Sequence, residues 1–343
     1  MHFLAIRSIL KFLRPTLVMS LLAGGTAGIA PNDTEVSVAA GGIQMTKDTR
    51  ISMEKERLTI GREKVTVEYE FLNESDADIT TQVAFPVGHF CFEGECGPPA
   101  FADFRVWIEG REVKFAVKAI ATIDGNDYTS VLQDMGVDVG SYGHWRFLAD
   151  QQANYDVSRL PGSDREKLIK LGLIDKADLS PQWHVQQVYY WSQSFPSKKI
   201  LHIRHEYQPA TGYQPYLPAE LPQAHPDACI DPGLHKRLLA DNQAFRANRK
   251  FGANGHESVD DYVHTFWIDY ILTTANNWKT PIKDFTLIIE KPANSTDFPY
   301  PWYVSFCWDG PVQKISERQY IAHKQNFIPR NELRIYLLTL MGQ

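Results

Sequence analysis

The chain has 343 residues, of which 43% are hydrophobic and 12% aromatic, a composition typical of a globular protein and not of a disordered one. Its 35 basic and 41 acidic residues give a formal net charge of −6. An acidic surface argues against general binding to nucleic acid or to anionic membranes.

The first 30 residues contain the three parts of a secretory signal peptide. Three basic residues in the first 14 precede a short apolar run over 16–23, and small residues follow. The run is short for a membrane span, although a membrane anchor or a buried first helix is the alternative. We expect cleavage after Ala27 or Ala30, and therefore a periplasmic or secreted protein with no membrane span once the signal is removed.

Alternation of apolar and polar residues with period two dominates the next segment. It occurs over 65–71, 79–85, 104–108 and 113–117, as in strands that bury one face and expose the other. These four runs predict an antiparallel meander. We expect an N-terminal β-sandwich-like domain over residues 31–125.

The middle of the chain changes character and predicts a partly helical connection over residues 126–180. Ser163 and Glu166 form a capping-box pattern for a short helix that ends near Gly172. This helical insertion should lie around residues 150–175. A second helix is expected to begin at Asp231-Pro232, with Leu234, Leu238 and Phe245 on its buried side.

The C-terminal part, residues 181–343, returns to strands. Alternating runs cover 201–207, 266–272, 285–289 and 333–337, with turn residues between them. The sequence therefore predicts a mainly β fold of antiparallel β-sandwich-like units with a small helical insertion. We place a C-terminal, mainly β domain over these residues.

Four cysteines suggest disulfide bonds if the chain is exported, and four cysteines allow three pairings. Cys91 and Cys96 enclose a short glycine-containing loop and can close locally, which leaves Cys229 to pair with Cys307. The alternative is four buried free thiols. The Cys229–Cys307 bridge would stabilise the fold by about 4.5 kcal/mol in the chain-entropy model.

Side chains that could carry chemistry do not form a recognisable motif. The GxSxG, GxxxxGK[ST] and GxGxxG patterns are absent, and His202 and His205 should point to opposite faces of one strand. We therefore expect no catalytic, cofactor-binding or metal-binding residues and no cofactor. The densest group of metal-ligand types lies in the loop where we favour a disulfide over zinc: His89, Cys91, Glu93, Glu95 and Cys96.

Two aromatic clusters have different expected roles. The first, Tyr189-Tyr190-Trp191, fits the core of a strand. The second contains Tyr300, Trp302 and Tyr303 and is interrupted by prolines, which keep a segment out of a central strand. We predict that this second cluster is a possible contact surface, because exposed aromatic rings often anchor interfaces.

Six short segments occur in order along the mature chain: Asn32-Asp33-Thr34, Ala40-Gly41-Gly42-Ile43, Val67-Glu68-Tyr69-Glu70-Phe71-Leu72-Asn73, Val83-Ala84-Phe85-Pro86, Tyr270-Ile271-Leu272-Thr273-Thr274-Ala275-Asn276-Asn277-Trp278 and Cys307-Trp308-Asp309-Gly310. Together they resemble the bacterial exported family catalogued as domain of unknown function 4424. The resemblance implies an envelope protein with a signal peptide and without an assigned activity, so it supplies no catalytic residues.

Residues 65–130 are also similar to the vault/inter-α-trypsin type of domain, which implies a β-sandwich used in protein–protein contacts.

Two classes of function agree with these observations. The one we favour is a non-catalytic binding or assembly module that recognises an envelope protein or glycan. The alternative is a periplasmic hydrolase acting on an envelope glycan or ester, because two catalytic carboxylates brought together only by folding leave no sequence motif.

Overall fold

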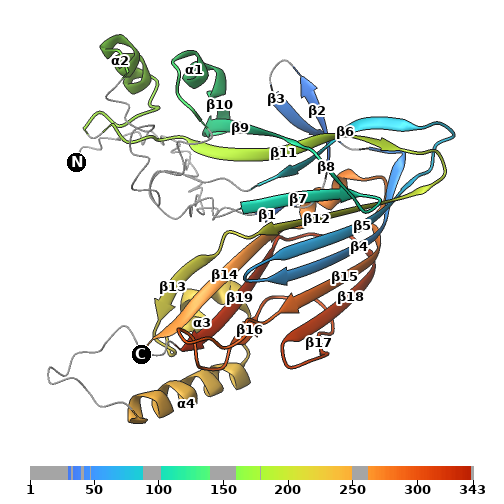
Figure 1. Cartoon of the computed structure of the whole chain (residues 1–343). Coiled ribbons are helices and arrows are strands. Elements are labelled where there is room, and N and C mark those ends of the chain that lie inside the picture. The colour runs from blue at the N-terminus through green and yellow to red at the C-terminus, as the bar shows by residue number, and fades with distance from the viewer. Residues whose placement is uncertain are drawn as a thin grey trace, which may run out of the picture.

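Three β-sheets and a few helices make up the computed structural model shown in Figure 1. The structure describes residues 48–87, 102–139, 160–177, 179–248 and 262–340, together with the backbone of three strands at 30–31, 34–39 and 42–46. Within these residues the sheets have eight, six and five strands. The predicted mainly β, sandwich-like fold is confirmed.

The eight-stranded sheet, which we call the central sheet, forms one layer of the sandwich, with one face toward the core and the other exposed (Figure 1). Most neighbouring strands run antiparallel, but β15 pairs with β4 in parallel. In spatial order its strands are β17 (Gln313–Lys314), β18 (Gln319–Phe327), β15 (Ile282–Glu290), β4 (Ile51–Gly61), β5 (Val65–Asn73), β12 (Ile200–Gln208), β7 (Ala102–Ile108) and β8 (Arg111–Val113).

The other two sheets pack against the inner face of the central sheet. The six-stranded sheet has the order β10 (Asn126–Asp127), β9 (Ala116–Ile123), β11 (His184–Phe195), β6 (Ile79–Pro86), β2 (Thr34–Ala39) and β3 (Gly42–Thr46). The five-stranded sheet contains β14 (Val263–Ile271), flanked by β1 (Ala30–Pro31) and β13 (Gly212–Tyr216) on one side and by β19 (Leu333–Leu340) and β16 (Tyr303–Ser305) on the other.

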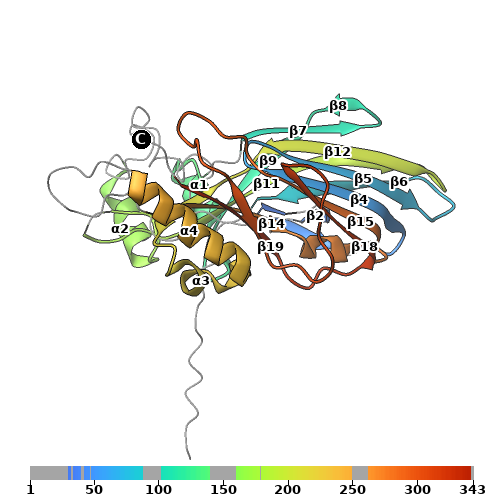
Figure 2. The same ribbon diagram turned by 90° about the horizontal axis from the view of Figure 1, so that it is seen from below.

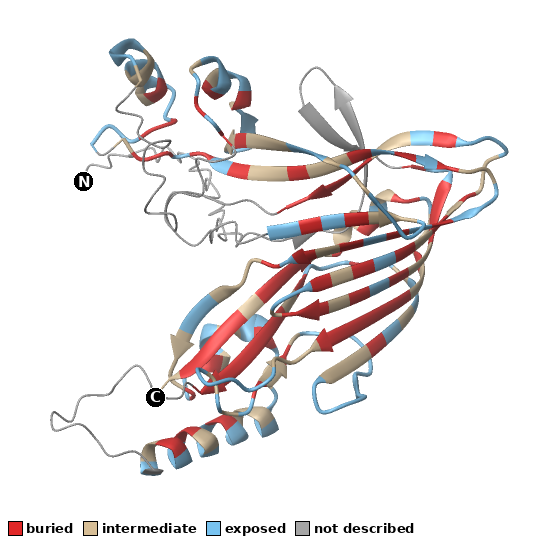
Figure 3. Cartoon of the chain, viewed as in Figure 1, coloured by how far each residue is buried: buried red, intermediate tan, exposed pale blue. Residues whose placement is uncertain are grey.

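One apolar core joins all three sheets. It includes Val67 and Phe71 of β5, Phe85 of β6, Phe285 of β15 and Ile335 of β19, each fully buried. Burying each of these side chains stabilises the fold by about 1.5–3 kcal/mol. Figure 3 shows the alternation of buried and exposed residues along the central strands that the sequence predicts.

Helices form two smaller cores at the ends of the sandwich. Helices α1 (Thr129–Asp134) and α2 (Gly162–Lys170) pack beside β9 and β11 around Trp183. Helices α3 (Leu221–Ala224) and α4 (Pro232–Asn248), with the short 3₁₀ turn η3 (Pro226–Ala228) between them, cover the second face of the five-stranded sheet (Figure 2). A further 3₁₀ turn, η5 (Thr273–Asn277), follows β14. Strands β14 and β19 are therefore buried on both faces.

The predictions about the helices are confirmed in position but not in every cap. The side chain of Asp231 accepts hydrogen bonds from the backbone N–H groups of Gly233 and Leu234, 2.7 and 3.0 Å away, and α4 starts there as predicted. Leu238 packs in the core on its inner side. The predicted cap at Ser163 is wrong, because α2 begins one residue earlier after Pro161 and has no side-chain cap.

The predicted N-terminal meander is wrong. Strands β5 and β7 belong to the central sheet, whereas β6 and β9 belong to the six-stranded sheet. Strand β12 lies between β5 and β7, and β11 lies between β6 and β9. Alternation tells which side chains of a strand are buried but not which strand lies beside it, so the pairing with distant β11 and β12 is not visible in the sequence. Val117, expected to be buried, is 48% exposed.

Strand pairing also crosses the domain boundaries that the sequence suggests. The central sheet combines β4, β5 and β7 from residues 31–125 with β12, β15 and β18 from residues 181–343. The two segments therefore build one sheet and one core together.

Candidate functional site

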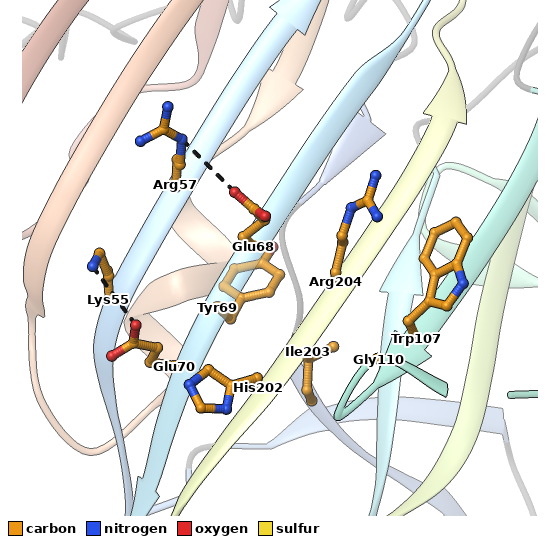
Figure 4. A pocket seen from close by; sticks show the side chains of 10 residues that line it. All are labelled: Lys55, Arg57, Glu68, Tyr69, Glu70, Trp107, Gly110, His202, Ile203 and Arg204. Carbon is orange, nitrogen blue, oxygen red and sulfur yellow. Dashed lines mark ion pairs between the residues drawn. The ribbon is translucent and has the colours of Figure 1, made fainter. Parts of the chain in front are cut away.

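A groove lies on the outer face of the central sheet, over strands β4, β5, β12 and β7 (Figure 4). Its volume is about 450 Å³. We call it the sheet groove, and its lining residues are Lys55, Arg57, Glu68, Tyr69, Glu70, Trp107, Gly110, His202, Ile203 and Arg204.

Strand register places the polar side chains of the groove in two rows across the sheet. In one row, Arg57, Glu68, Arg204 and Trp107 are successive cross-strand neighbours. In the other row Lys55 lies opposite Glu70, which in turn lies opposite His202. Because cross-strand neighbours lie about 5 Å apart, each row forms a continuous polar strip.

Ion pairs along these rows are long and exposed to solvent. Lys55 Nζ lies 3.6 Å from Glu70 Oε1, and Arg57 Nε lies 3.7 Å from Glu68 Oε2 (Figure 4). Arg204 also forms an ion pair with Glu206. Such surface pairs contribute about 0–1 kcal/mol each to stability, so a ligand can replace them with its own ion pairs at little cost in free energy.

Trp107 gives the groove its one large aromatic side chain that is partly exposed. The guanidinium carbons of Arg105 and Arg204 each lie 4.9 Å from its ring centroid. Arg105 is fixed in turn by two hydrogen bonds to Glu112, at 2.9 and 2.6 Å. The indole is therefore held at the rim between two cations.

A histidine–carboxylate pair lies at the edge of the groove. Glu109 Oε1 accepts a hydrogen bond of 2.7 Å from the backbone N–H of His202 and lies 3.1 Å from its Nδ1. The backbone hydrogen bond from His202, together with the side-chain contact, lowers the pKa of Glu109. The pair orients the imidazole as a general base requires, but the lining residues supply no serine, threonine or cysteine beside it. The hydroxyl among them, that of Tyr69, points into the core and lies 3.4 Å from that of Tyr270.

Among the described residues no group of three or more His, Cys, Asp or Glu side chains is arranged to hold a metal. The loop with His89, Cys91, Glu93, Glu95 and Cys96 lies outside those residues. Likewise, no described helix is both long and apolar enough to cross a bilayer. His202 is exposed and His205 is fully buried, so the prediction that they face opposite sides of β12 is confirmed.

The predicted contact surface around Trp302 is wrong. Trp302 is 2% exposed and packs on Phe266 and Phe298, with ring centroids 5.6 and 5.2 Å away. Tyr300 packs edge-on against Phe245 of α4. The prolines do keep this segment at the sheet edge as predicted, but that edge is covered by α4 and by the β4–β5 turn.

Tyr303 is held by the same helix. Its hydroxyl donates a hydrogen bond to Asp241 of α4. Burial raises the pKa of Tyr303 to about 12, and the hydrogen bond to Asp241 adds to the effect. The second aromatic cluster therefore joins α4 to the sheet and offers no free surface at Trp302.

The predicted bridge between Cys229 and Cys307 is present, with the two Cα atoms 5.1 Å apart. It ties the end of η3 to the residues after β16. The predicted Cys91–Cys96 bridge lies outside the described residues.

Of the groove residues, only His202 was considered for a chemical role from the sequence, and none was predicted to be functional, although one signal was available. In the run from Phe104 to Ile108 the apolar positions face the core, so Trp107 and Arg105 fall on the solvent face. A tryptophan at an outward position of an otherwise polar strand face is a sequence signal for a contact surface. The other members were invisible because they come from strands that are distant in sequence.

Comparison with known proteins identifies the family. The family model described as "Domain of unknown function (DUF4424)" matches residues 31–336, so the chain belongs to that family. No curated protein matches the sequence.

Two solved structures are similar to this chain, both at low identity and low TM-score. A protein of Legionella pneumophila, for which a nutrient-binding role is suggested, is 14% identical with a TM-score of 0.42, over 90% of this chain and 70% of that chain. Native yeast LTA4 hydrolase is 9% identical with a TM-score of 0.26, over 84% of this chain and 29% of that chain. Neither likeness is close enough to support an assignment of function.

Proposed function

We propose that this protein is exported by its N-terminal signal and acts in the envelope as a non-catalytic binding module, with the sheet groove as the surface that recognises a protein partner. The observation that carries the proposal is Trp107, held between Arg105 and Arg204 on an open polar face. Tryptophan and arginine are the residue types that dominate binding energy at protein interfaces.

The charge pattern of the groove supports a polypeptide partner. Positive and negative side chains alternate across the rows, and their mutual pairing is weak and exposed. A segment of a partner that carries both signs of charge can replace these pairs with ion pairs of its own. The charge pattern then fixes the position at which the segment binds along the groove. A uniformly charged ligand would meet repulsion from one half of the groove.

A photo-crosslinking amino acid at position 107 in the full exported chain tests the proposal. We expect a covalent adduct with one envelope protein, which a matched probe at Leu239 of α4, 41% exposed, does not form. Arg204→Glu should reduce the adduct at position 107. Trp107→Ala should weaken binding of the captured protein by about 2 kcal/mol, roughly thirtyfold in Kd.

Two results would contradict a protein-binding groove: equal adducts at positions 107 and 239, or an adduct at 107 that Arg204→Glu leaves unchanged.

The hydrolase alternative is supported by the oriented His202–Glu109 pair. It predicts turnover of p-nitrophenyl acetate or of purified peptidoglycan that His202→Gln abolishes. Such turnover would replace the binding proposal with a catalytic one.

A further inference from the structure

A second cavity lies at the end of the central sheet and shares no lining residue with the sheet groove. Its volume is about 460 Å³, and the residues that line it come from the β4–β5 turn (61–64), the segment after β15 (290–295), Trp302 and Arg318. A pocket of this size can hold a small organic ligand. We call it the turn cavity.

The turn cavity is positively charged in a protein that is acidic as a whole. Four cationic residues line it, Arg62, Lys64, Lys291 and Arg318, against two acidic residues, Glu63 and Glu290. Their formal sum is +2, whereas the whole chain carries −6. Glu290 accepts a hydrogen bond of 2.7 Å from Gln319, and Lys64 pairs with Glu206 at 3.1 Å. Arg62, Lys291 and Arg318 are then the cations left to serve a ligand.

Arg62 is held by aromatic rings and not by a counter-ion. Its guanidinium carbon lies 4.4 Å from the ring centroid of Phe266 and 5.2 Å from that of Phe298. Within the part of the chain that the structure describes, no carboxylate lies within ion-pair distance of this guanidinium. Ring faces attract the cation but accept none of the strong hydrogen bonds that its N–H groups can donate. An oxyanion would supply them.

Lys291 and Arg318 lie beside each other in the lining of the cavity. Arg318 Nε donates a hydrogen bond of 2.9 Å to the backbone carbonyl of Lys291, which fixes the guanidinium near the lysine. Burial lowers the pKa of Lys291, the positive charges of Lys314 and Arg318 lower it further, and Glu317 opposes them. A bound anion would offset this repulsion between cations.

We propose that the turn cavity binds a phosphate group, carried by a small soluble molecule or by a lipid headgroup. Arginine matches phosphate with parallel N–H···O bonds, and lysine adds a compact positive charge. The cavity is larger than one phosphate, which leaves room for a polar substituent. This site does not depend on the function proposed for the sheet groove.

Isothermal titration calorimetry of the full mature chain tests the site with inorganic phosphate and with glycerol 3-phosphate. We expect saturable binding of both, at least tenfold weaker in Lys291→Gln and in Arg318→Gln. Arg57→Gln, a charge removal in the sheet groove, is the matched control and should bind as the wild type does. Thermal melts of each variant establish that weaker binding does not reflect unfolding.

Vesicles distinguish the two sources of phosphate. Cosedimentation with phosphatidylglycerol in phosphatidylcholine vesicles, lost in Lys291→Gln, assigns the site to a lipid headgroup, whereas binding of glycerol 3-phosphate without vesicle binding assigns it to a soluble ligand. Three results would overturn the proposal: neither probe binds, a chloride salt at the same ionic strength as the phosphate abolishes binding, or Arg57→Gln weakens phosphate binding as much as Lys291→Gln does. Failure of crosslinking at Trp107 would leave this result unaffected.

Discussion

Two tryptophans show how the position of a single residue decides its role. Trp302 follows two prolines at a sheet edge, yet it is 2% exposed because Phe266, Phe298 and the guanidinium of Arg62 pack around it. Trp107 lies within a strand, yet it faces solvent between two arginines. The prolines beside Trp302 suggest an exposed ring, whereas the alternation around Trp107 agrees with its position on the solvent face.

Replacing each tryptophan by alanine should therefore affect different measurements. Trp302→Ala leaves a cavity in the common core, so the free energy of unfolding should fall by about 3–5 kcal/mol. Trp107→Ala removes a partly exposed ring and should lower the free energy of unfolding by less than about 1 kcal/mol. Urea unfolding followed by circular dichroism measures both. Equal losses in the two variants would remove the distinction between a core and a surface tryptophan.

At the scale of elements, the sequence predicts most strands and both longer helices but not their neighbours. Alternation in 65–71 and 201–207 identifies the buried faces of β5 and β12 correctly. Nothing in either strand indicates that they lie side by side, because backbone hydrogen bonds are the same for any partner. The sheet groove depends on this adjacency, which brings Glu68 beside Arg204, and so it could not be predicted.

A polar network joins the η3 turn to β19, beside the apolar packing of Ala228 in the same cluster as Tyr336 and Leu338. The hydroxyl of Tyr336 lies 2.8 Å from Asp227 and 3.0 Å from His225 Nδ1. Arg334 pairs with Asp227 at 3.1 Å and forms two hydrogen bonds with Asp269. Burial, aided by the charge of Arg334, lowers the pKa of His225 below its usual 6.5, while Asp227 opposes the shift.

The lowered pKa of His225 predicts the direction in which the free energy of unfolding changes with pH. The folded state favours neutral His225, so its contribution to stability is complete above about pH 6.5 and is lost as pH falls through that value toward the lower folded pKa. His225→Gln cannot be protonated, so its free energy of unfolding should fall less than that of the wild type between pH 7.5 and 5.5. Urea titrations at both pH values measure the difference. An unchanged pH dependence in the variant would show that His225 does not contribute.

At the scale of the whole molecule, the central sheet makes the fold depend on both ends of the sequence. Strand β15 pairs in parallel with β4 over seven residue pairs, from Asp284 opposite Lys55 to Glu290 opposite Gly61. Strand β12 pairs with β5 and β7. Composition and periodicity suggest a boundary between residues 120 and 180, because a helical stretch interrupts the strands there. The chain instead crosses back into the same sheet after this stretch.

A fragment ending at residue 180 tests this dependence. It keeps β4 to β9 but loses β11, which pairs with β6 and β9, and β12, which pairs with β5 and β7. Strands β5, β6, β7 and β9 would expose unpaired backbone groups and apolar side chains of the common core, so the fragment should not fold. We expect no near-ultraviolet circular dichroism and no cooperative melt from residues 31–180, whereas the full chain should unfold in one transition seen equally by tryptophan fluorescence and far-ultraviolet circular dichroism. A cooperative melt of the fragment alone, or two separate transitions in the full chain, would instead establish two independent domains.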